Sequence, residues 1–288
     1  MEVSRSAFYD WIKGKEKSTG KNQEQKKLEM AIVDTFKVHR RRYGVRRIVM
    51  ELRALGFDVG RQKVRSVMQA HGLVAIQPRS FVPRTTDSRH PYLISPNLLL
   101  DRAPPVRPNE VWVGDITYIP MSGGGFCYLA VWMDLYSRRI KGWHLDMHMK
   151  EELVITALRN AFSKGRVPKG MILHSDRGGQ YAGKIFRRLI GGRGLSQSMS
   201  RADNPYDNAF MESLYSRFKA ELMGNGAFES LEDARTEIFE YIEMYYNTVR
   251  RHSSLGYLSP DKFEKQYYCE SNSKGREATK TPAAASKK

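Results

Sequence analysis

Residues 111–119 constrain the fold most tightly, because this segment is apolar on both of its faces. It is rich in β-branched and aromatic residues and is bounded by Asn109 and Pro120, which predicts a β-strand. The two-residue period of a strand puts Trp112 and Val113 on opposite faces, each among other apolar residues. A strand of this kind lies in the middle of a sheet that is covered on both sides.

Asp115 is the exception in this segment, since a carboxylate in the middle of a buried strand is costly unless its charge is compensated. A metal ion, a basic partner or protonation would each remove that cost. Asp134, which also follows an apolar segment, is a competing candidate for a functional carboxylate. We interpret it as a structural residue, because the chain turns at residues 135–138.

The apolar patterns that follow predict a mixed α/β sheet. We expect strands at 126–133, 139–145, 171–174 and 195–199, with helices at 150–164 and 183–190. Three strands, a helix, a strand, a helix and a strand give a sheet with helices on its faces. Asp176 comes directly after the fourth strand, beside a pair of glycines, and a later helix that starts near Pro205 carries Glu212.

The positive charge of the chain is concentrated in its N-terminal part. The formal net charge is +17, and residues 1–108, with 22 Lys and Arg against 10 Asp and Glu, carry +12 of it. Segments 25–38, 45–55 and 61–71 have helical apolar spacing, and a glycine-bounded turn joins the last two. This pattern predicts a helix-turn-helix whose second helix enters a DNA major groove, although a helical hairpin with solvated charge would share it. The basic residues of its outer face are Arg46, Arg47, Arg61, Lys63 and Arg65.

Composition excludes several other classes of protein. No apolar run approaches the roughly 18 residues that a membrane span requires. Cys127 and Cys269 are far apart and stand in no metal-ligand pairing, so neither a disulfide framework nor a zinc finger can be built. We therefore expect a DNA-binding protein that acts in the cytoplasm and has no membrane partner.

These patterns predict six parts of the chain. They are an N-terminal helical segment (1–24), a helix-turn-helix-like domain (25–76), a basic Pro-rich linker (77–108), an α/β core (109–225), a helical extension (226–270) and a disordered basic tail (271–288). We expect the linker to lie along DNA phosphates. The extension contains a predicted packing helix at 231–249, followed by Arg250 and Arg251, which are candidates either for DNA contact or for a basic cap.

The sequence around three carboxylates resembles a known family. Asp115, Asp176 and Glu212, with 35 residues between the last two and Lys219 seven beyond, are similar to the DD35E pattern of retroviral integrases and related transposases. The local sequences are similar to those of the second-frame (OrfB) transposases of the IS3 insertion-sequence family. The matching segments are Trp-x-Gly-Asp-Ile-Thr-Tyr-Ile at 112–119, Asp-x-x-Ser-Arg-Arg-Ile at 134–140, His-Ser-Asp-Arg-Gly-Gly-Gln-Tyr at 174–181, Asp-Asn-Pro-x-Asp-Asn-Ala-x-x-Glu at 203–212 and Tyr-Asn-x-x-Arg-Arg-His at 246–252.

The resemblance implies an RNase H-like integrase core, a mixed five-stranded sheet with flanking helices, behind a small helical DNA-binding domain. It also implies a transposase that cleaves DNA at insertion-sequence ends and transfers the strands. In such an enzyme Asp115, Asp176 and Glu212 hold two Mg²⁺ or Mn²⁺ ions, since hard ions prefer carboxylate oxygens, and Lys219 contacts DNA phosphate. The expected partners are double-stranded DNA in the bacterial nucleoid, the upstream-frame (OrfA) product or a frameshift fusion with it, and further copies of the chain.

Other interpretations compete with these expectations. A hydrolytic nuclease of the same fold would cut strands without joining them, and an inactive DNA-binding regulator would use the basic domain alone. His174 is more simply a hydrogen-bonded structural residue than a metal ligand. Asn204 and Asn208 are more simply helix caps than DNA contacts.

Overall fold

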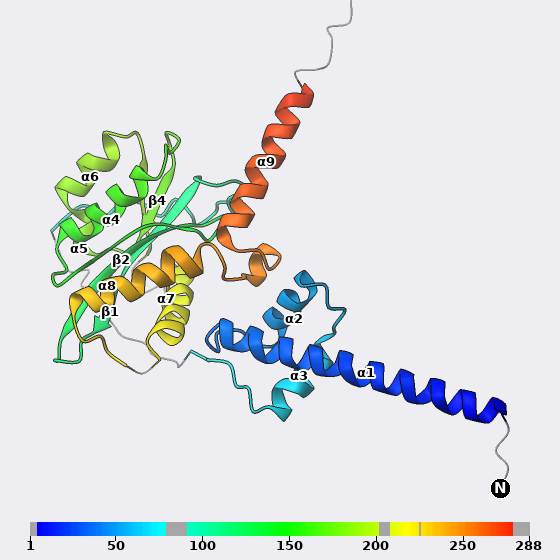
Figure 1. The fold of residues 1–288 in the computed structure, drawn as a ribbon. Coiled ribbons are helices and arrows are strands. Elements are labelled where there is room, and N and C mark those ends of the chain that lie inside the picture. Colours follow the sequence, from blue (N-terminus) through cyan, green and yellow to red (C-terminus); the bar gives the residue numbers. More distant parts are fainter. Residues whose placement is uncertain (1–4, 79–90, 202–207, 225, 279–288) are drawn as a thin grey trace, which may run out of the picture. The chain divides into compact units, whose positions relative to one another are not determined.

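The chain divides after Gln77 into two compact units, each with its own core (Figure 1). The computed structural model describes residues 5–78, 91–201, 208–224 and 226–278. Within these residues, no helix is both long enough and apolar enough to cross a membrane.

The N-terminal unit is built from three helices. They are α1 (Arg5–Val38), α2 (Val45–Ala54) and α3 (Arg61–Ala70). Each helix contributes an apolar side chain, Ile32, Ile48 and Val64 respectively, that is fully buried between them. Gly56, with a φ of +88°, starts the turn between α2 and α3 in a conformation that glycine adopts at no steric cost.

The second unit contains one five-stranded sheet in the order β3-β2-β1-β4-β5. The strands are β1 (Val111–Pro120), β2 (Phe126–Asp134), β3 (Ile140–Asp146), β4 (Ile172–Ser175) and β5 (Ser196–Met199). β1 pairs antiparallel with β2 and parallel with β4, while β3 is antiparallel to β2 and β5 is parallel to β4. The predicted mixed sheet is confirmed, and β1 is its central strand.

Helices cover both faces of this sheet (Figure 1). One face packs against α4 (Glu151–Ser163), α5 (Gly179–Ala182) and α6 (Lys184–Gly191). The other packs against α7 (Ala209–Leu222), α8 (Leu231–Phe239) and the π-helical segment Glu240–Tyr246. A 3-10 turn (Ser253–Leu255) and α9 (Pro260–Ala278) follow. β1 is fully buried over residues 111–114, whereas Asp115 and Ile116 in the middle of the strand are partly exposed.

Gly142 on β3 allows the closest approach of α4 to the sheet. A Cβ atom at this position would lie 2.5 Å from the backbone nitrogen of Ala161 and would also collide with the carbonyl oxygen of Ala157. We expect Gly142→Ala to push α4 outward and to lower the free energy of unfolding by about 2 kcal/mol, measured by urea denaturation. Gly123→Ala is the control, since nothing lies within 4 Å of a Cβ there; equal effects of the two substitutions would contradict the packing argument.

Three helices depart from the predicted boundaries. α1 begins at Arg5, within the segment 1–24 that was expected to be separate, because no proline interrupts residues 5–38. α9 continues to Ala278, so the first part of the predicted disordered tail is helical; again no proline intervenes, and Gln266 Nε2 donates to Glu270 Oε1 one turn on (2.9 Å). The predicted helix at 231–249 is regular only to Phe239, after which the wider π-helical turn directs Tyr241 and Tyr246 into the core.

The second half of the predicted linker contacts the sheet. Ser95 Oγ donates to Gln197 Oε1 (2.9 Å), and the backbone N–H of Leu98 donates to Ser198 Oγ (2.9 Å). β5 is an edge strand, and an uncovered edge exposes unpaired backbone groups. These linker residues therefore cover β5, and DNA contact by the linker stays a prediction.

Candidate active site

Asp115 and Asp176 lie side by side at the open end of the sheet. Val113 of β1 is level with His174 of β4 in the parallel pairing. Asp115 lies two residues further along β1, and Asp176 directly follows Ser175, the last residue of β4. The negative charge of Asp176 contributes to a raised pKa at Asp115, as expected of neighbouring carboxylates. The parallel pairing of β1 with β4 thus brings together two of the three predicted site residues.

Burial is the main reason why the pKa of Asp115 is raised well above its usual value, followed by the charge of Asp176. Two hydrogen bonds oppose this shift by stabilising the carboxylate. The backbone N–H of Ile116 donates to Asp115 Oδ1 (2.8 Å), and the side chain of Asn208 also bonds to the carboxylate. Glu212 adds the smallest contribution that raises the pKa. The site therefore concentrates negative charge on two partly buried aspartates and the exposed Glu212.

Replacing Asp115 by Asn should stabilise the metal-free protein at neutral pH. The pKa of Asp115 is higher in the folded protein than in the unfolded chain, so the wild type loses stability as the pH rises above about 4, until the folded carboxyl is itself ionised. Asn does not ionise, and the stability difference between the variant and the wild type should therefore grow with pH and then level off. Thermal unfolding in EDTA between pH 4 and pH 8 measures this difference, and a constant value would contradict it.

Glu212 lies on the first turn of α7 and is exposed, in contrast to the two aspartates. Among the described residues no group of three His, Cys, Asp or Glu side chains is arranged to hold a metal ion. Glu212 is therefore adjacent to the aspartate pair but does not close a three-carboxylate cluster with it. Lys219, two turns further along α7, is half-buried; burial lowers its pKa, whereas the charge of Asp115 favours its protonated form.

Two residues contact Asp115 in ways that the sequence does not indicate. The hydroxyl of Tyr215 is buried and donates to the carbonyl oxygen of Asp115 (2.6 Å). Asn208 makes no side-chain capping bond at the start of α7 and instead bonds to the Asp115 carboxylate, which corrects its predicted role as a cap. Tyr215 stands three residues after Glu212 at an apolar-looking helix position, so no pattern distinguished it from core. Asn204 lies outside the described residues.

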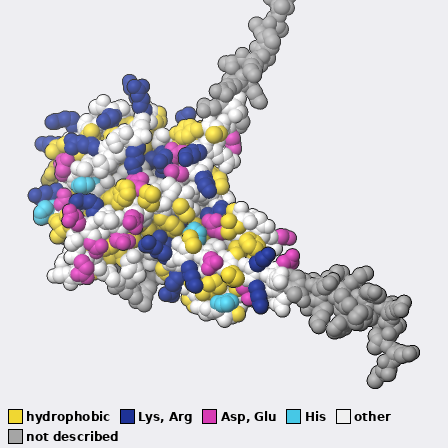
Figure 2. Space-filling model, in the orientation of Figure 1, with side chains coloured by type: hydrophobic (Ala, Val, Ile, Leu, Met, Phe, Trp, Pro, Cys, Tyr) yellow, Lys and Arg dark blue, Asp and Glu magenta, His cyan; other side chains and the backbone are white. Residues whose placement is uncertain are grey.

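Four of the predicted DNA-contact residues are exposed on the N-terminal unit. They are Arg46 on α2 and Arg61, Lys63 and Arg65 on α3. Arg47 is half-buried, because its guanidinium lies over the ring of Tyr43, 5.4 Å from the centroid. Lys and Arg side chains are also exposed on the second unit (Figure 2). The helix-turn-helix face is thus available for phosphate contact, as its sequence pattern predicts.

Arg250 is buried in an ion pair, whereas Arg251 is only partly buried. The guanidinium of Arg250 is buried and donates twice to Glu221, through Nη2 to Oε1 (2.5 Å) and through Nε to Oε2 (2.8 Å). Tyr241 also donates its hydroxyl to Glu221 Oε2 (2.9 Å). Arg251 Nη1 donates to the carbonyl oxygen of Tyr257 (3.1 Å) and so holds the loop after it. For Arg250 the predicted DNA contact is corrected, because its charge compensates the buried carboxylate of Glu221 inside the fold.

His174 and Asp134 have structural contacts. His174 is fully buried, and its Nδ1 lies 2.8 Å from Ser198 Oγ on the adjacent strand. Asp134 is fully buried as well and accepts hydrogen bonds from the backbone N–H groups of Asn109 (2.6 Å) and Ser137 (2.8 Å). The bond between Asp134 and Ser137 fixes the β2–β3 turn. The contacts of both residues support their structural interpretation.

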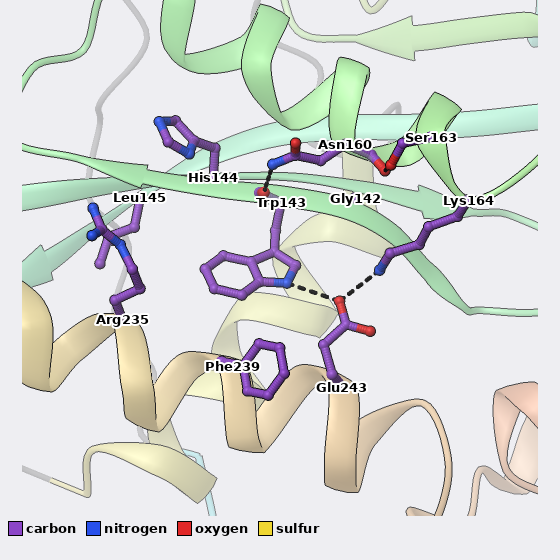
Figure 3. Close-up of a pocket in the computed structure, with 10 residues that line it drawn as sticks. All are labelled: Gly142, Trp143, His144, Leu145, Asn160, Ser163, Lys164, Arg235, Phe239 and Glu243. Carbon is purple, nitrogen blue, oxygen red and sulfur yellow. Dashed lines mark hydrogen bonds and ion pairs between the residues drawn. The ribbon is translucent and has the colours of Figure 1, made fainter.

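A hollow of about 330 Å³ lies at the free edge of β3, but none of the three carboxylates lines it (Figure 3). Glu243 of the π-helical segment accepts from Trp143 Nε1 on β3 (3.0 Å) and from Lys164 Nζ after α4 (2.6 Å). Asn160 Nδ2 donates to the carbonyl oxygen of Trp143 (3.1 Å). These contacts tie α4 and the π-helical segment to the edge strand.

The oxygen atoms at the aspartate pair suit a hard divalent ion. Mg²⁺ prefers carboxylate and carbonyl oxygens, and Asp115 and Asp176 supply two carboxylates from adjacent elements. Asn208 Oδ1 is buried beside them without a hydrogen-bond partner in the described part of the chain. An unpaired buried oxygen next to two acids is the feature expected where a cation is the missing partner, so the residues present fit such an ion.

Comparison with known families agrees with this geometry. Residues 105–205 match the integrase core domain, residues 193–260 match a second integrase core domain family, and residues 23–81 match an HTH-like domain. These domains define the chain as a polynucleotidyl transferase of the integrase and transposase class, and they imply binding to DNA. The chain belongs to the IS3 family of insertion-sequence transposases.

Relatives match over nearly their whole length. The chain is 38% identical to an uncharacterized 31 kDa protein of insertion element IS600 from Shigella sonnei, over 92% of this chain and 96% of that protein. It is 40% identical to the transposase for IS904 from Lactococcus lactis (84% and 95%) and 35% identical to transposase InsF for IS3A from Escherichia coli (92% and 91%). Among solved structures, the HTLV-2 integrase catalytic core in complex with magnesium matches at 16% identity and a TM-score of 0.40, over 55% of this chain and 98% of that one.

Proposed function

We propose that this transposase cleaves and joins DNA by a two-ion mechanism in which Asp115, Asp176 and Glu212 are the catalytic carboxylates. The observation that supports the proposal is the proximity of Asp115 on β1 to Asp176, directly after the parallel strand β4, where burial and the charge of Asp176 raise the pKa of Asp115. Two like charges are held together at such a site only with a compensating cation or proton. Glu212, on the neighbouring α7, would act as the third ligand.

Each residue has a distinct task in this mechanism. Asp115, Asp176 and Glu212 would hold the divalent ions, which when bound would supply activation of the attacking oxygen and stabilisation of the leaving oxygen of the phosphodiester. Asn208 and the backbone N–H of Ile116 orient the Asp115 carboxylate. Lys219, whose protonated form is favoured by the charge of Asp115, would contact the DNA phosphate.

Strand transfer from a pre-cut end tests the proposal. A labelled duplex that carries an insertion-sequence end with a free 3′-OH is incubated with target DNA, the full chain and Mg²⁺, with and without the upstream-frame product. We expect joined products that depend on the metal ion. Cleavage without joining would identify a hydrolytic nuclease, and binding with neither reaction would identify an inactive regulator.

The exposed basic face of α3 is the proposed DNA-binding surface. We expect Lys63→Ala to weaken DNA binding at low salt and to reduce the slope of log K against log salt by about 1, because one phosphate contact is lost. Fluorescence anisotropy with duplex DNA over a range of salt concentrations measures this slope. Lys26→Ala, at an exposed lysine on α1, is the control; the same loss of slope there would assign the effect to net charge alone.

The proposed setting is the bacterial nucleoid. The chain would act there on insertion-sequence ends and target DNA, as a homo-oligomer and together with the upstream-frame (OrfA) product or as a frameshift fusion with it. Size-exclusion chromatography with light scattering, on DNA and with the OrfA product added, reports on both associations.

A further inference from the structure

Tyr181 is held rigidly next to the aspartate pair. It lies on α5, five residues after Asp176, and is 1% exposed. Its ring packs edge-to-face against both Trp132 and Phe186, with centroids 5.7 Å away in each case. Its carbonyl oxygen accepts from Gln197 Nε2 (2.6 Å), which ties the backbone to β5. The position of the hydroxyl is therefore set by packing.

The Tyr181 hydroxyl has no hydrogen-bond partner in the part of the chain that the structure describes, although it is fully buried. It lies near enough to Asp115 and Asp176 for their charges to raise its pKa, after the larger effect of burial. An unpaired buried hydroxyl reduces stability. Phenylalanine would make the same ring contacts without that cost, so packing does not account for the oxygen atom.

We propose that Tyr181 is a positioning residue of the divalent-ion site, whose hydroxyl donates a hydrogen bond to the Asp115–Asp176 pair when both carboxylates are ionised around an ion. This inference rests on the proposed function, since it takes the two aspartates to be ion ligands. A donor outside the ligands fixes the orientation of the carboxylates and leaves their other lone pairs for the ion. Tyr215 already fixes the backbone of Asp115, so Tyr181 would complete the support from the opposite face of the sheet.

Mg²⁺ binding by the full chain, in the absence of DNA, tests this inference. The rise in melting temperature with Mg²⁺ concentration gives the concentration for half-saturation, and Asp115→Asn shows which part of that rise belongs to the site. We expect Tyr181→Phe to melt at the same or a higher temperature than the wild type in EDTA. We also expect it to require about tenfold more Mg²⁺ for half-saturation.

Tyr241→Phe is the matched control, because it makes the same chemical change at a buried tyrosine whose hydroxyl does have a partner, Glu221. It should melt earlier in EDTA and keep the Mg²⁺ half-saturation of the wild type. If Tyr181→Phe binds Mg²⁺ as the wild type does while Asp115→Asn does not, the role of Tyr181 is overturned and the ion site stands. If Mg²⁺ raises the melting temperature of the wild type and of Asp115→Asn equally, or of neither, the proposed ion site is wrong. The role of Tyr181 is then wrong as well.

Discussion

Replacing Asp115 by Asn is expected to lower both strand cleavage and strand joining by at least about three orders of magnitude, while DNA binding is retained. The two side chains have nearly the same shape, but the amide cannot supply the charge that holds a divalent ion, and losses of roughly this size follow the removal of a transition-state stabiliser. Asp176→Asn and Glu212→Gln should behave in the same way. End-labelled insertion-sequence duplexes measure cleavage, and pre-cut duplexes measure joining.

Glu152→Gln is the matched control for these substitutions. It also neutralises an acidic side chain of the catalytic unit, but this one is exposed on α4, where it contacts the exposed Arg159 (2.9 Å) and Thr156 (3.3 Å) of the same helix. Its activity should remain close to that of the wild type. Cleavage retained in Asp115→Asn, under conditions where the control is active, would remove Asp115 from the mechanism.

Arg250→Met is expected to destabilise the catalytic unit by about 3–5 kcal/mol, which corresponds to a fall in melting temperature of about 10 °C. The substitution leaves Glu221 as a buried carboxylate that has lost both hydrogen bonds from the guanidinium, although Tyr241 still donates to it. Arg250→Met with Glu221→Leu should be less destabilising than Arg250→Met alone, because the double variant buries no charge. Differential scanning calorimetry of the three proteins measures these effects.

Arg159→Met provides the comparison for an exposed ion pair. Because Arg159 and Glu152 are both solvent-exposed, its removal should change the unfolding free energy by less than about 1 kcal/mol. Normal stability of Arg250→Met together with weakened DNA binding would restore the original prediction that Arg250 contacts DNA. A large loss of stability with unchanged DNA affinity at low temperature would support its structural role.

The sequence predicted the sheet well because local patterns decide local structure. The apolar period of residues 111–119 required a central strand, and the alternation of strand and helix patterns required a mixed sheet. α5 was not predicted, because its four residues are too few to show a helical period. The sequence could not reveal the partners of Asn208 and Tyr215, since each contact joins α7 to a residue about a hundred positions earlier in the chain.

By itself, then, the sequence determined the order of the elements, the family and which acidic residues stand at strand ends, because these properties depend on neighbours along the chain. The tertiary structure decided which charged groups are buried and with what partner. Arg250 looked like a surface cation from its neighbours, and only the packing of α7 against the π-helical segment buries it on Glu221. Burial depends on residues that are distant in sequence. For this reason, the neighbours of an arginine along the chain do not show whether it contacts DNA or forms a buried ion pair.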